Sequence, residues 1–454
     1  MSVSFTDFSP ETIAWQNDFA AEFFNEVDWS TGVHEFLMSG SVGSAKSTLM
    51  AWIAIHECLA FPRNRGLLCR KSLPDLKKTI FQACVELLQD SDMVEGIDYH
   101  IIETTAQIHF LKTGSELISI SWADKRYKKF RSIAAGFAIF EELTENNEEQ
   151  SQAYHECLMR VGRLNHVKRS FVISATNPDD PGHWAYKHFI TTEDNSRHVH
   201  YSVTEDNPFL PKTYVEKLKK NLDPLMAERM LYGKWIEISK DKLYYSYERS
   251  RNYVDQHYKI DTNYPIAICY DFNIGAGKPF STVLGQYIDD HFHFFTEVII
   301  NGARTLDQLE EMAGRGYLDH NTTYEVYGDA TGEARTTKAI HSDYDIIKKF
   351  LSNYRAPDGR SLQYKMCVPR ANPPIRERHN TVNSYCYNAN KEIRLHVYKD
   401  CKTLDEGMRL TALKKGGEYI EDDSKHFQHC TTAIGYYVTY KHRNKRQLAA
   451  SVIG

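Results

Sequence analysis

The chain has 454 residues, more than one hydrophobic core usually serves, so two domains are expected. Its 42% hydrophobic and 25% charged residues are typical of a globular protein, and no apolar stretch approaches the ~20 residues that cross a bilayer, so no membrane association is expected. A net charge of −5 argues against a protein that coats nucleic acid; any nucleic-acid contact has to come from local basic patches.

The N-terminal segment has no basic region followed by an apolar run, so export is not expected. The nine cysteines are scattered, without a C-x-x-C pair or a zinc-like spacing. They are interpreted as reduced cytosolic thiols that serve mainly in packing.

Residues 1–235 alternate short apolar runs with segments of helical period, which predicts an α/β domain with a mostly parallel sheet. In chain order, the expected elements are a strand at 35–38, a helix at 47–59, a strand at 66–69, a helix with Leu76, Ile80, Cys84 and Leu87–Leu88 on one stripe, a strand at 133–140 and a strand at 171–175.

A polar, tyrosine-rich passage at 238–259 is interpreted as the connection between two domains. After it we expect a strand at 266–270 that ends at Asp271, a hairpin of 281–287 and 291–300, a helix from Thr305, and a strand at 323–327 before Asp329. RNase H-like sheets begin in this order. The predicted domains are an α/β domain at 1–240, a linker at 241–263 and an RNase H-like mixed α/β domain at 264–454. Residues 441–446 are predicted to be a short basic tail.

The first strand leads into a phosphate-loop pattern, G-x-x-x-x-G-K-[ST], in which Ala45 replaces the last glycine. Loop N–H groups and the following helix N-terminus would cradle the phosphates of ATP, Lys46 would reach the β- and γ-oxygens, and Ser47 would bind Mg²⁺. The alternative for such a loop is an ordinary turn. The predicted nucleotide-binding residues are Gln16, Gly40, Ser41, Gly43, Ser44, Ala45, Lys46, Ser47, Thr48, Glu141 and Asn177.

Two acids end the apolar run at 134–140. Glu141 is predicted to join the Mg²⁺ shell and Glu142 to act as the catalytic base beside the attacking water. The alternative is a solvated acidic cap. Asn177, after the strand at 171–175, could sense the γ-phosphate or belong to a plain strand-ending turn, and Gln16 could contact adenine or be a surface glutamine.

Hydrolysis also needs a cation near the γ-phosphate. The candidates are Arg70, Arg126, Arg131, Arg160 and Arg163.

These motifs together resemble the large terminase subunits of tailed bacteriophages, over nearly the whole chain. The resemblance rests on Gln16, the loop ending Ala45-Lys46-Ser47, Arg70-Lys71-Ser72, Phe130-Arg131-Ser132, Glu141-Glu142, Thr176-Asn177-Pro178, His183-Trp184-Ala185-Tyr186, Asp206-Asn207-Pro208-Phe209-Leu210-Pro211 and Gly233-Lys234-Trp235. The pairing of D-N-P-F-L-P with G-x-W about two dozen residues later is the most specific part.

The resemblance implies an enzyme with two activities. The first domain, 1–240, would be a P-loop ATPase motor that drives double-stranded viral DNA into a procapsid, and the second, 264–454, would be a nuclease that cuts concatemeric DNA. The resemblance also implies a homo-oligomeric ring, expected to be a pentamer, on the portal protein, a small terminase subunit as partner, and a place in the host cytoplasm rather than in the mature virion. Members of the family commonly carry arginine where this loop has Val42. Arg131 is therefore the preferred finger toward a neighbouring subunit, and Arg70 is the alternative.

Cleavage by two Mg²⁺ or Mn²⁺ ions needs carboxylates that hold both ions. Asp271 and Asp329 each end a predicted strand and are the expected ligands, although a strand-terminal aspartate can also be a plain turn former. The family's last helix typically reads H-x-x-D-A-L-x-Y, and here Thr432 stands where that aspartate belongs. The possible substitutes are Asp422, Asp423, His426, His429 or a DNA phosphate, and His429 is preferred.

The expected DNA contacts are Lys125, Arg126, Lys128, Lys129 and the tail at 443–446; each run could equally be a solvated face. Two alternatives stay open. One is a packaging ATPase whose second domain is a weak or inactive nuclease that binds DNA or portal. The other is a helicase or repair ATPase, which the D-N-P-F-L-P and G-x-W pairing disfavours.

Overall fold

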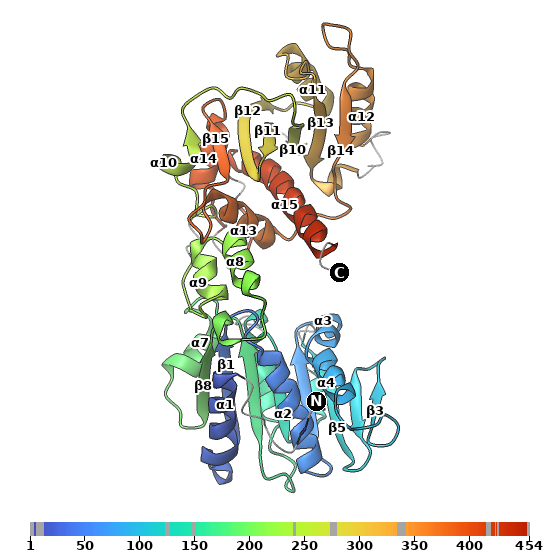
Figure 1. Cartoon of the computed structure of the whole chain (residues 1–454), viewed down its shortest axis with the longest axis vertical. Coiled ribbons are helices and arrows are strands. Elements are labelled where there is room, and N and C mark those ends of the chain that lie inside the picture. The colour runs from blue at the N-terminus through green and yellow to red at the C-terminus, as the bar shows by residue number, and fades with distance from the viewer. Residues whose placement is uncertain are drawn as a thin grey trace. The chain divides into compact units, whose positions relative to one another are not determined.

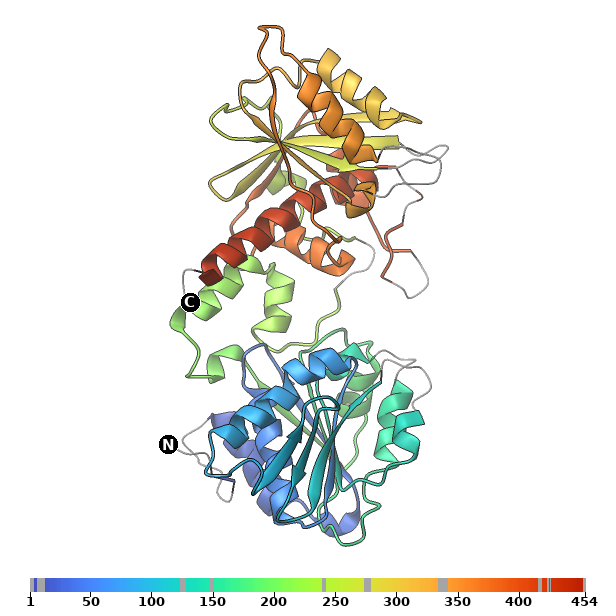
Figure 2. The same ribbon diagram turned by 90° about the vertical axis from the view of Figure 1, so that its right-hand side faces the viewer.

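The computed structural model describes residues 4–5, 13–122, 128–146, 151–238, 242–272, 279–333, 342–414, 419–422, 424 and 426–451. The chain divides into two compact units, which Figures 1 and 2 show from two sides. Unit 1 comprises Met1–Glu216 and Leu225–Ile238, and unit 2 comprises Lys217–Pro224 and Ser239–Gly454.

Unit 1 is built on a sheet flanked by helices. Its strands are β1 (His34–Gly40), β2 (Arg65–Arg70), β3 (Tyr99–Ile102), β4 (Gln107–Phe110), β5 (Ser115–Ser121), β6 (Phe137–Phe140), β7 (Phe171–Thr176) and β8 (Arg197–Ser202). Its helices are α1 (Ala14–Ala21), α2 (Lys46–Ala60), α3 (Leu73–Lys78), α4 (Ile80–Gln89), α5 (Lys128–Arg131), α6 (Ser151–Leu158) and α7 (Trp184–Tyr186), with α8 (Lys212–Asn221) and α9 (Pro224–Met230) spanning both units' boundaries.

The strand order in unit 1 is β3-β4-β5-β2-β6-β7-β1-β8. The strands from β5 to β8 in this order run parallel, and β3 and β4 add an antiparallel edge. This agrees with the predicted mostly parallel sheet. Because successive side chains of a strand point to opposite faces, Phe36 and Met38 enter the core shared with α1, α2 and α4, whereas Leu37 enters the core shared with α6 and α7.

Unit 2 has a second, mixed sheet. Its strands are β9 (Tyr253–Val254), β10 (Ile266–Asp271), β11 (Pro279–Ile288), β12 (His291–Asn301), β13 (Thr323–Gly328), β14 (Gln363–Met366) and β15 (Leu395–Tyr398). Its helices are α10 (Arg249–Asn252), α11 (Thr305–Gly314), α12 (Asp343–Asn353), α13 (Ile375–Cys386), α14 (Lys402–Leu410) and α15 (Gln428–Ser451). Short 3₁₀ or π turns in the two units lie at Glu22–Glu26, Trp29–Thr31, Leu143–Glu145, Lys187–Thr191, Thr204–Asp206 and Ala330–Glu333.

The order in the second sheet is β14-β13-β10-β11-β12-β15-β9, with the predicted antiparallel hairpin of β11 and β12 beside β10. Ile266, Ile268 and Tyr270 face a core with residues of α11 and α12, and Ala267 and Cys269 face one with residues of α13, α14 and α15. Figure 2 shows these two helical layers on opposite faces of the sheet.

In unit 1, three parts of the structure differ from what the sequence led us to expect. The helix expected after β2 is divided into α3 and α4 at Thr79, whose backbone (φ −121°, ψ −102°) is not helical. The predicted apolar stripe is still buried across both helices, at Leu76, Ile80, Cys84 and Leu88. The strand expected at 133–140 comprises only Phe137–Phe140. The meander β3–β5 was not predicted, because β3 and β4 have only four residues each and all three strands are only partly buried.

The two ends of unit 2's sequence contribute to its core. In the tyrosine-rich passage, Tyr244 and Tyr247 are completely buried among residues of α13, α14 and α15. The basic segment at 441–446 is not a tail, because it continues α15, and Arg443 donates to both carboxylate oxygens of Glu377 at 2.9 and 2.7 Å.

All nine cysteines are buried and none forms a disulfide. Within the described residues, no helix is long and apolar enough to cross a membrane.

A stack of imidazole rings lies on β12 and β15. The ring centroids of His293 and His396 are 5.1 Å apart, and those of His291 and His396 are 5.4 Å apart. Burial lowers the pKa of both His293 and His396 to about 4, and the neighbouring imidazoles add to this shift. The folded protein therefore keeps these two rings neutral at neutral pH.

Because these two histidines stay neutral in the folded protein, we predict that the fold loses stability in acid. Between pH 6.5 and 4 the unfolded chain binds protons that the folded His293 and His396 do not, so the free energy of unfolding should fall as the pH falls through this window. The replacement His396→Gln should reduce that loss, measured by urea unfolding at pH 7 and pH 5. The exposed His257→Gln is the control, and an equal loss in wild type and His396→Gln would contradict the prediction.

Candidate functional sites

The phosphate-loop motif connects β1 to α2. Lys46 is the first residue of α2, and Ala45 before it has a left-handed backbone (φ 65°, ψ 30°). This is a conformation that glycine adopts freely and alanine only at a cost of about 1–2 kcal/mol. Ala45, which stands where the motif has glycine, therefore adopts the left-handed backbone expected of that glycine.

Four side chains from outside the loop hold its backbone. Trp15 Nε1 donates to Ser44 O at 3.1 Å, and Gln16 Nε2 donates to Ala45 O at 2.9 Å. Thr204 Oγ1 donates to Val42 O at 2.7 Å, and Asn207 Nδ2 donates to Gly43 O at 2.7 Å. Gln16 is only 4% exposed, so the alternative of a surface glutamine is wrong. Asn207 belongs to the D-N-P-F-L-P motif, which therefore contributes directly to the shape of the loop.

Lys46 is buried under this loop. Its Nζ donates to Gly40 O at 2.9 Å, to Ser41 O at 2.7 Å and to Asn177 Oδ1 at 3.3 Å. Burial lowers the pKa of Lys46 to about 8, although the nearby carboxylates of Glu142 and Glu141 act in the opposite direction.

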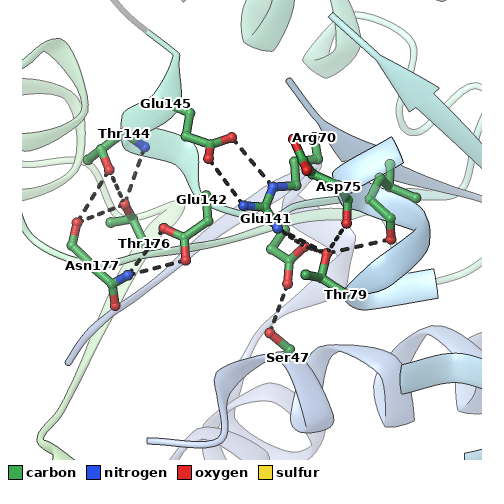
Figure 3. Close-up of polar contacts among 11 residues, drawn as sticks. Ser47, Arg70, Asp75, Thr79, Glu141, Glu142, Thr144, Glu145, Thr176 and Asn177 are labelled. Carbon is green, nitrogen blue, oxygen red and sulfur yellow. Dashed lines mark hydrogen bonds and ion pairs between the residues drawn. The ribbon is translucent and has the colours of Figure 1, made fainter. Parts of the chain in front are cut away.

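Glu141 lies between the loop and a polar cluster on the other side (Figure 3). Its Oε1 accepts from Ser47 Oγ at 2.9 Å, and its Oε2 accepts from Arg70 Nη1 at 3.2 Å and from the Thr79 hydroxyl. Arg70 also donates to Glu145, at 3.1 and 3.4 Å. The α3–α4 break at Thr79 thereby brings a hydroxyl to the acidic pair.

Glu142 has a left-handed backbone (φ 51°), a strained state for a residue with a side chain. Asn177 Nδ2 donates to both of its carboxylate oxygens, at 3.2 and 3.3 Å. Burial raises the pKa of Glu142, against the lowering effect of Lys46 and Arg70. Asn177 therefore touches Lys46 with one end of its amide and Glu142 with the other.

Among the described arginine candidates, Arg70 contacts this cluster. Arg131 has a 57% exposed side chain and pairs with Glu156 at 3.4 Å. Arg160 pairs with the same glutamate at 3.5 Å, Arg163 donates to Met159 O, and Arg126 lies outside the described residues. Thr48 is on the exposed side of α2.

A second polar site lies in unit 2. The parallel strands β10 and β13 pair Tyr270 with Gly328, so Asp271 and Asp329, which follow these residues, stand at the ends of neighbouring strands. Asp271 Oδ2 is 2.8 Å from His429 Nδ1 on α15. Asp329 accepts from Asn372 Nδ2 at 2.7 Å, from Thr331 N at 2.7 Å and from Tyr436 Oη at 3.3 Å.

The pKa of the Asp329 carboxyl lies below its ordinary value. Burial alone would raise the pKa of its carboxyl, but the hydrogen bonds from Asn372, Thr331 and Tyr436 outweigh burial and lower it. Neither Asn372 nor Tyr436 was singled out as a site residue from the sequence, although Tyr436 is the final residue of the H-x-x-D-A-L-x-Y pattern.

Thr432 has an acidic partner that sequence reasoning missed. Its Oγ1 donates to Glu421 Oε2 at 3.0 Å. Glu421 also pairs with Arg378 and lies 2.6 Å from His379 Nε2. The neighbour Asp422 accepts from Ser424 N in its own loop, His426 is exposed, and Asp423 lies outside the described residues. Glu421 directly precedes Asp422 and Asp423, the two acids that the sequence analysis considered.

Within the described parts of the chain, no three His, Cys, Asp or Glu side chains are grouped closely enough to hold a metal ion as they stand. Of the predicted DNA-contacting residues, Lys129 is exposed on α5, whereas Lys125, Arg126 and the side chains of Lys128, Lys445 and Arg446 lie outside what is described.

Comparisons with known proteins find similarity to phage large terminases. Residues 33–233 match the family model described as phage terminase large subunit. The PBSX phage terminase large subunit of Bacillus subtilis (strain 168) is 25% identical over 213 residues, 42% of this chain and 46% of the relative. The chain thus matches about half the length of that curated relative, and the resemblance to large terminases is confirmed.

Solved structures extend the likeness to both units at the level of the fold. The large terminase of a thermophilic bacteriophage matches with a TM-score of 0.63 and 14% identity, over 94% of this chain and 98% of that chain. The same protein in complex with ADP (13% identity) and with ATP-γ-S (14%) matches with the same TM-score and coverage. The predicted fold class, a P-loop NTPase unit followed by an RNase H-like unit, is confirmed.

The left-handed backbone of Ala45 leads to a prediction about the stability of unit 1. Ala45→Gly removes the left-handed strain and should raise the free energy of unfolding of unit 1 by up to about 1 kcal/mol. Ala83→Gly, inside the regular helix α4, is the matched control and should lower it by about 1 kcal/mol. Chemical denaturation measures both, and a destabilised Ala45→Gly protein would show that the left-handed backbone is not present in solution.

Proposed function

We propose that the chain is an ATP-driven motor that packages double-stranded viral DNA and cuts it with a metal-dependent nuclease. The observation that carries the proposal is the convergence of Lys46, Ser47, Glu141, Glu142 and Asn177 at the ends of β1, β6 and β7, within residues that match the terminase family. The terminase of the thermophilic phage, with which the chain shares its fold, has been solved with ADP and with ATP-γ-S, which supports ATP as the nucleotide.

In the motor site, each residue has a role that follows from its contacts. The Ser47 hydroxyl and the Glu141 carboxylate, 2.9 Å apart, are hard oxygen donors that fit Mg²⁺. A bound Mg²⁺ would neutralise phosphate charge. The Lys46 ammonium would hold the β- and γ-oxygens, and Glu142, whose raised pKa favours accepting a proton, would serve as the base for the attacking water.

Asn177 would report the state of the γ-phosphate, because it touches both Lys46 and Glu142. Among the described arginine candidates, Arg70 donates to Glu141 and would act within its own subunit. Arg131, exposed on α5, stays the proposed finger toward a neighbouring subunit in a ring.

In the second unit, Asp271 and Asp329 are carboxylates on neighbouring strands, suited to Mg²⁺ or Mn²⁺, and His429 would complete the donor set. DNA, the portal protein, a small terminase subunit and a pentameric ring are the proposed partners, and the host cytoplasm is the proposed place of action. A second candidate, a packaging ATPase whose unit 2 only binds DNA or portal, is favoured by the neutral Thr432 at the acid's position.

The motor proposal predicts that Glu142→Gln reduces ATP turnover by about 10²–10⁴-fold while nucleotide binding persists, because only the proton acceptor is lost. Lys46→Ala should abolish turnover as well. Exposed Glu86→Gln is the control for a charge change in the same unit. Steady-state phosphate release and fluorescent-ADP binding measure the two effects; normal turnover in Glu142→Gln would refute its assignment as base.

The nuclease proposal predicts that the full chain nicks plasmid DNA in Mn²⁺ and that Asp271→Asn removes the cleavage. Asp289→Asn, in the exposed β11–β12 turn, should cleave like wild type. The whole chain is used because Tyr244 and Tyr247, which precede residue 260, are buried in unit 2. No digestion in any divalent metal would favour the binding-module function instead.

A further inference from the structure

The two carboxylate oxygens of Glu141 have different partners (Figure 3). Oε1 accepts from Ser47 Oγ at 2.9 Å, whereas Oε2 accepts from Arg70 Nη1 at 3.2 Å and from the Thr79 hydroxyl. Ser47 is in the first turn of α2, after the phosphate loop, and Arg70 ends β2. One oxygen is therefore turned to the loop where the triphosphate is proposed to bind, and the other is held by residues from β2 and the α3–α4 junction.

Arg70 is committed to its neighbours in this cluster. Its side chain is 14% exposed, and Nε, Nη1 and Nη2 all donate hydrogen bonds. Nη1 donates to Thr79 Oγ1 at 3.0 Å as well as to Glu141, and the other two nitrogens donate to Glu145 at 3.4 and 3.1 Å. A planar guanidinium that is bound on several sides has a fixed position and orientation. Arg70 is therefore placed to hold Glu141 rather than to extend toward a phosphate.

Thr79 can donate only one proton, and acceptors compete for it. The two nearest are Glu141 Oε2 and, at 2.9 Å, the backbone oxygen of Asp75. A threonine inside a continuous helix commonly donates to the carbonyl four residues earlier, which here is that of Asp75. A carboxylate is a stronger acceptor than a carbonyl, so we assign the proton to Glu141. Because the hydroxyl oxygen also accepts from Arg70, the three side chains form a closed ring of hydrogen bonds.

The core of unit 1 fixes the place of Thr79. Leu76 and Ile80, on either side of it in the sequence, are both completely buried in the core that α2 and α4 share. The non-helical backbone of Thr79 separates α3 from α4 between these two anchors. The hydroxyl therefore meets Glu141 at a position that packing sets.

A magnesium ion at a nucleotide site draws few ligands from the protein. One or two side chains typically hold it, and phosphate oxygens and water complete an octahedron that tolerates little distortion. A glutamate that is free to rotate would lose conformational freedom on binding the ion. Holding Oε2 of Glu141 in advance removes much of this loss, because Oε1 already lies beside Ser47.

Resting on the proposed ATPase function, we infer that Thr79 and Arg70 are positioning residues for Mg²⁺ binding. They hold one oxygen of Glu141 so that the other, beside Ser47, is presented to the ion of a bound nucleotide. Arg70 thus acts through Glu141 and not as a finger on the γ-phosphate. Neither Thr79 nor Arg70 contacts the nucleotide in this role, so both should affect its binding only when Mg²⁺ is present.

The part of the nucleotide affinity that depends on Mg²⁺ tests this role. The Kd of the full chain for mant-AMPPNP, a fluorescent, non-hydrolysable ATP analogue, is measured in excess Mg²⁺ and in EDTA. Thr79→Val keeps the shape of the side chain and removes its hydroxyl. It should raise the Kd in Mg²⁺ by about 5- to 10-fold, which approaches the worth of one hydrogen bond to a charged group, and leave the Kd in EDTA unchanged.

Two further variants accompany this measurement. Thr79→Ser keeps the hydroxyl and should retain the wild-type gain in affinity from Mg²⁺. Thr105→Val, at an exposed position in the β3–β4 turn of the same unit, is the matched control and should bind as wild type does in both conditions. Circular dichroism and thermal unfolding check that each variant is folded.

Arg70→Lys keeps the charge but not the fork of donors, and it provides a second test if Thr79→Val does not fold. Phosphate release is measured at rising Mg²⁺ concentration. If Arg70 positions Glu141, high Mg²⁺ refills the weakened site by mass action and should restore turnover toward the wild-type rate. A finger acts on the γ-phosphate itself, so turnover that stays low at every Mg²⁺ concentration would overturn the role given to Arg70.

The outcomes separate this inference from the ATPase proposal. A folded Thr79→Val protein with an unchanged Kd in Mg²⁺ overturns the inference. An equal loss of affinity in Mg²⁺ and in EDTA also overturns it, because Thr79 would then only support the phosphate loop. Both results leave the ATPase proposal standing. A wild-type chain that binds the analogue in neither condition would overturn the ATPase proposal and the inference with it.

Discussion

Burial of opposite charges at one edge of a parallel sheet is the constraint on which unit 1 depends. Lys46 and Glu141 are 8% and 4% exposed, and either charge alone would be costly to bury. The strand order places β1 beside β7 and β7 beside β6, so that the carboxyl ends of these strands meet and the charges compensate one another. The left-handed backbones of Ala45 and Glu142 are the local strain that this convergence requires.

Unit 2 meets a related constraint in another way. Its two aspartates also end neighbouring parallel strands, but the third side of the site is a helix from the end of the chain. There α15 offers a histidine, a threonine and a tyrosine, and the hydroxyl of Thr432 donates to Glu421, which pairs with Arg378. The helix that completes the core of unit 2 therefore also supplies the polar contacts of Asp271 and Asp329.

The motif residues were predictable because their spacing follows from local backbone geometry. The phosphate loop, the acids after β6 and the aspartates after β10 and β13 all lie where an apolar strand ends, a pattern visible in the sequence. The break at Thr79 was not predictable, since the apolar stripe continues across it. Its result, a hydrogen bond from the Thr79 hydroxyl to Glu141, joins residues that are 62 positions apart in the chain.

The sequence by itself determined the class of each fold and where along the chain apolar strands end in polar residues, because these depend on short-range patterns of burial and turn formation. Only the tertiary structure decided that Asn177 joins Lys46 to Glu142, that Arg70 lies among the acids, and that Glu421 meets Thr432. Such pairings join residues from separate elements. They are selected by the packing of whole strands and helices, which no local pattern records.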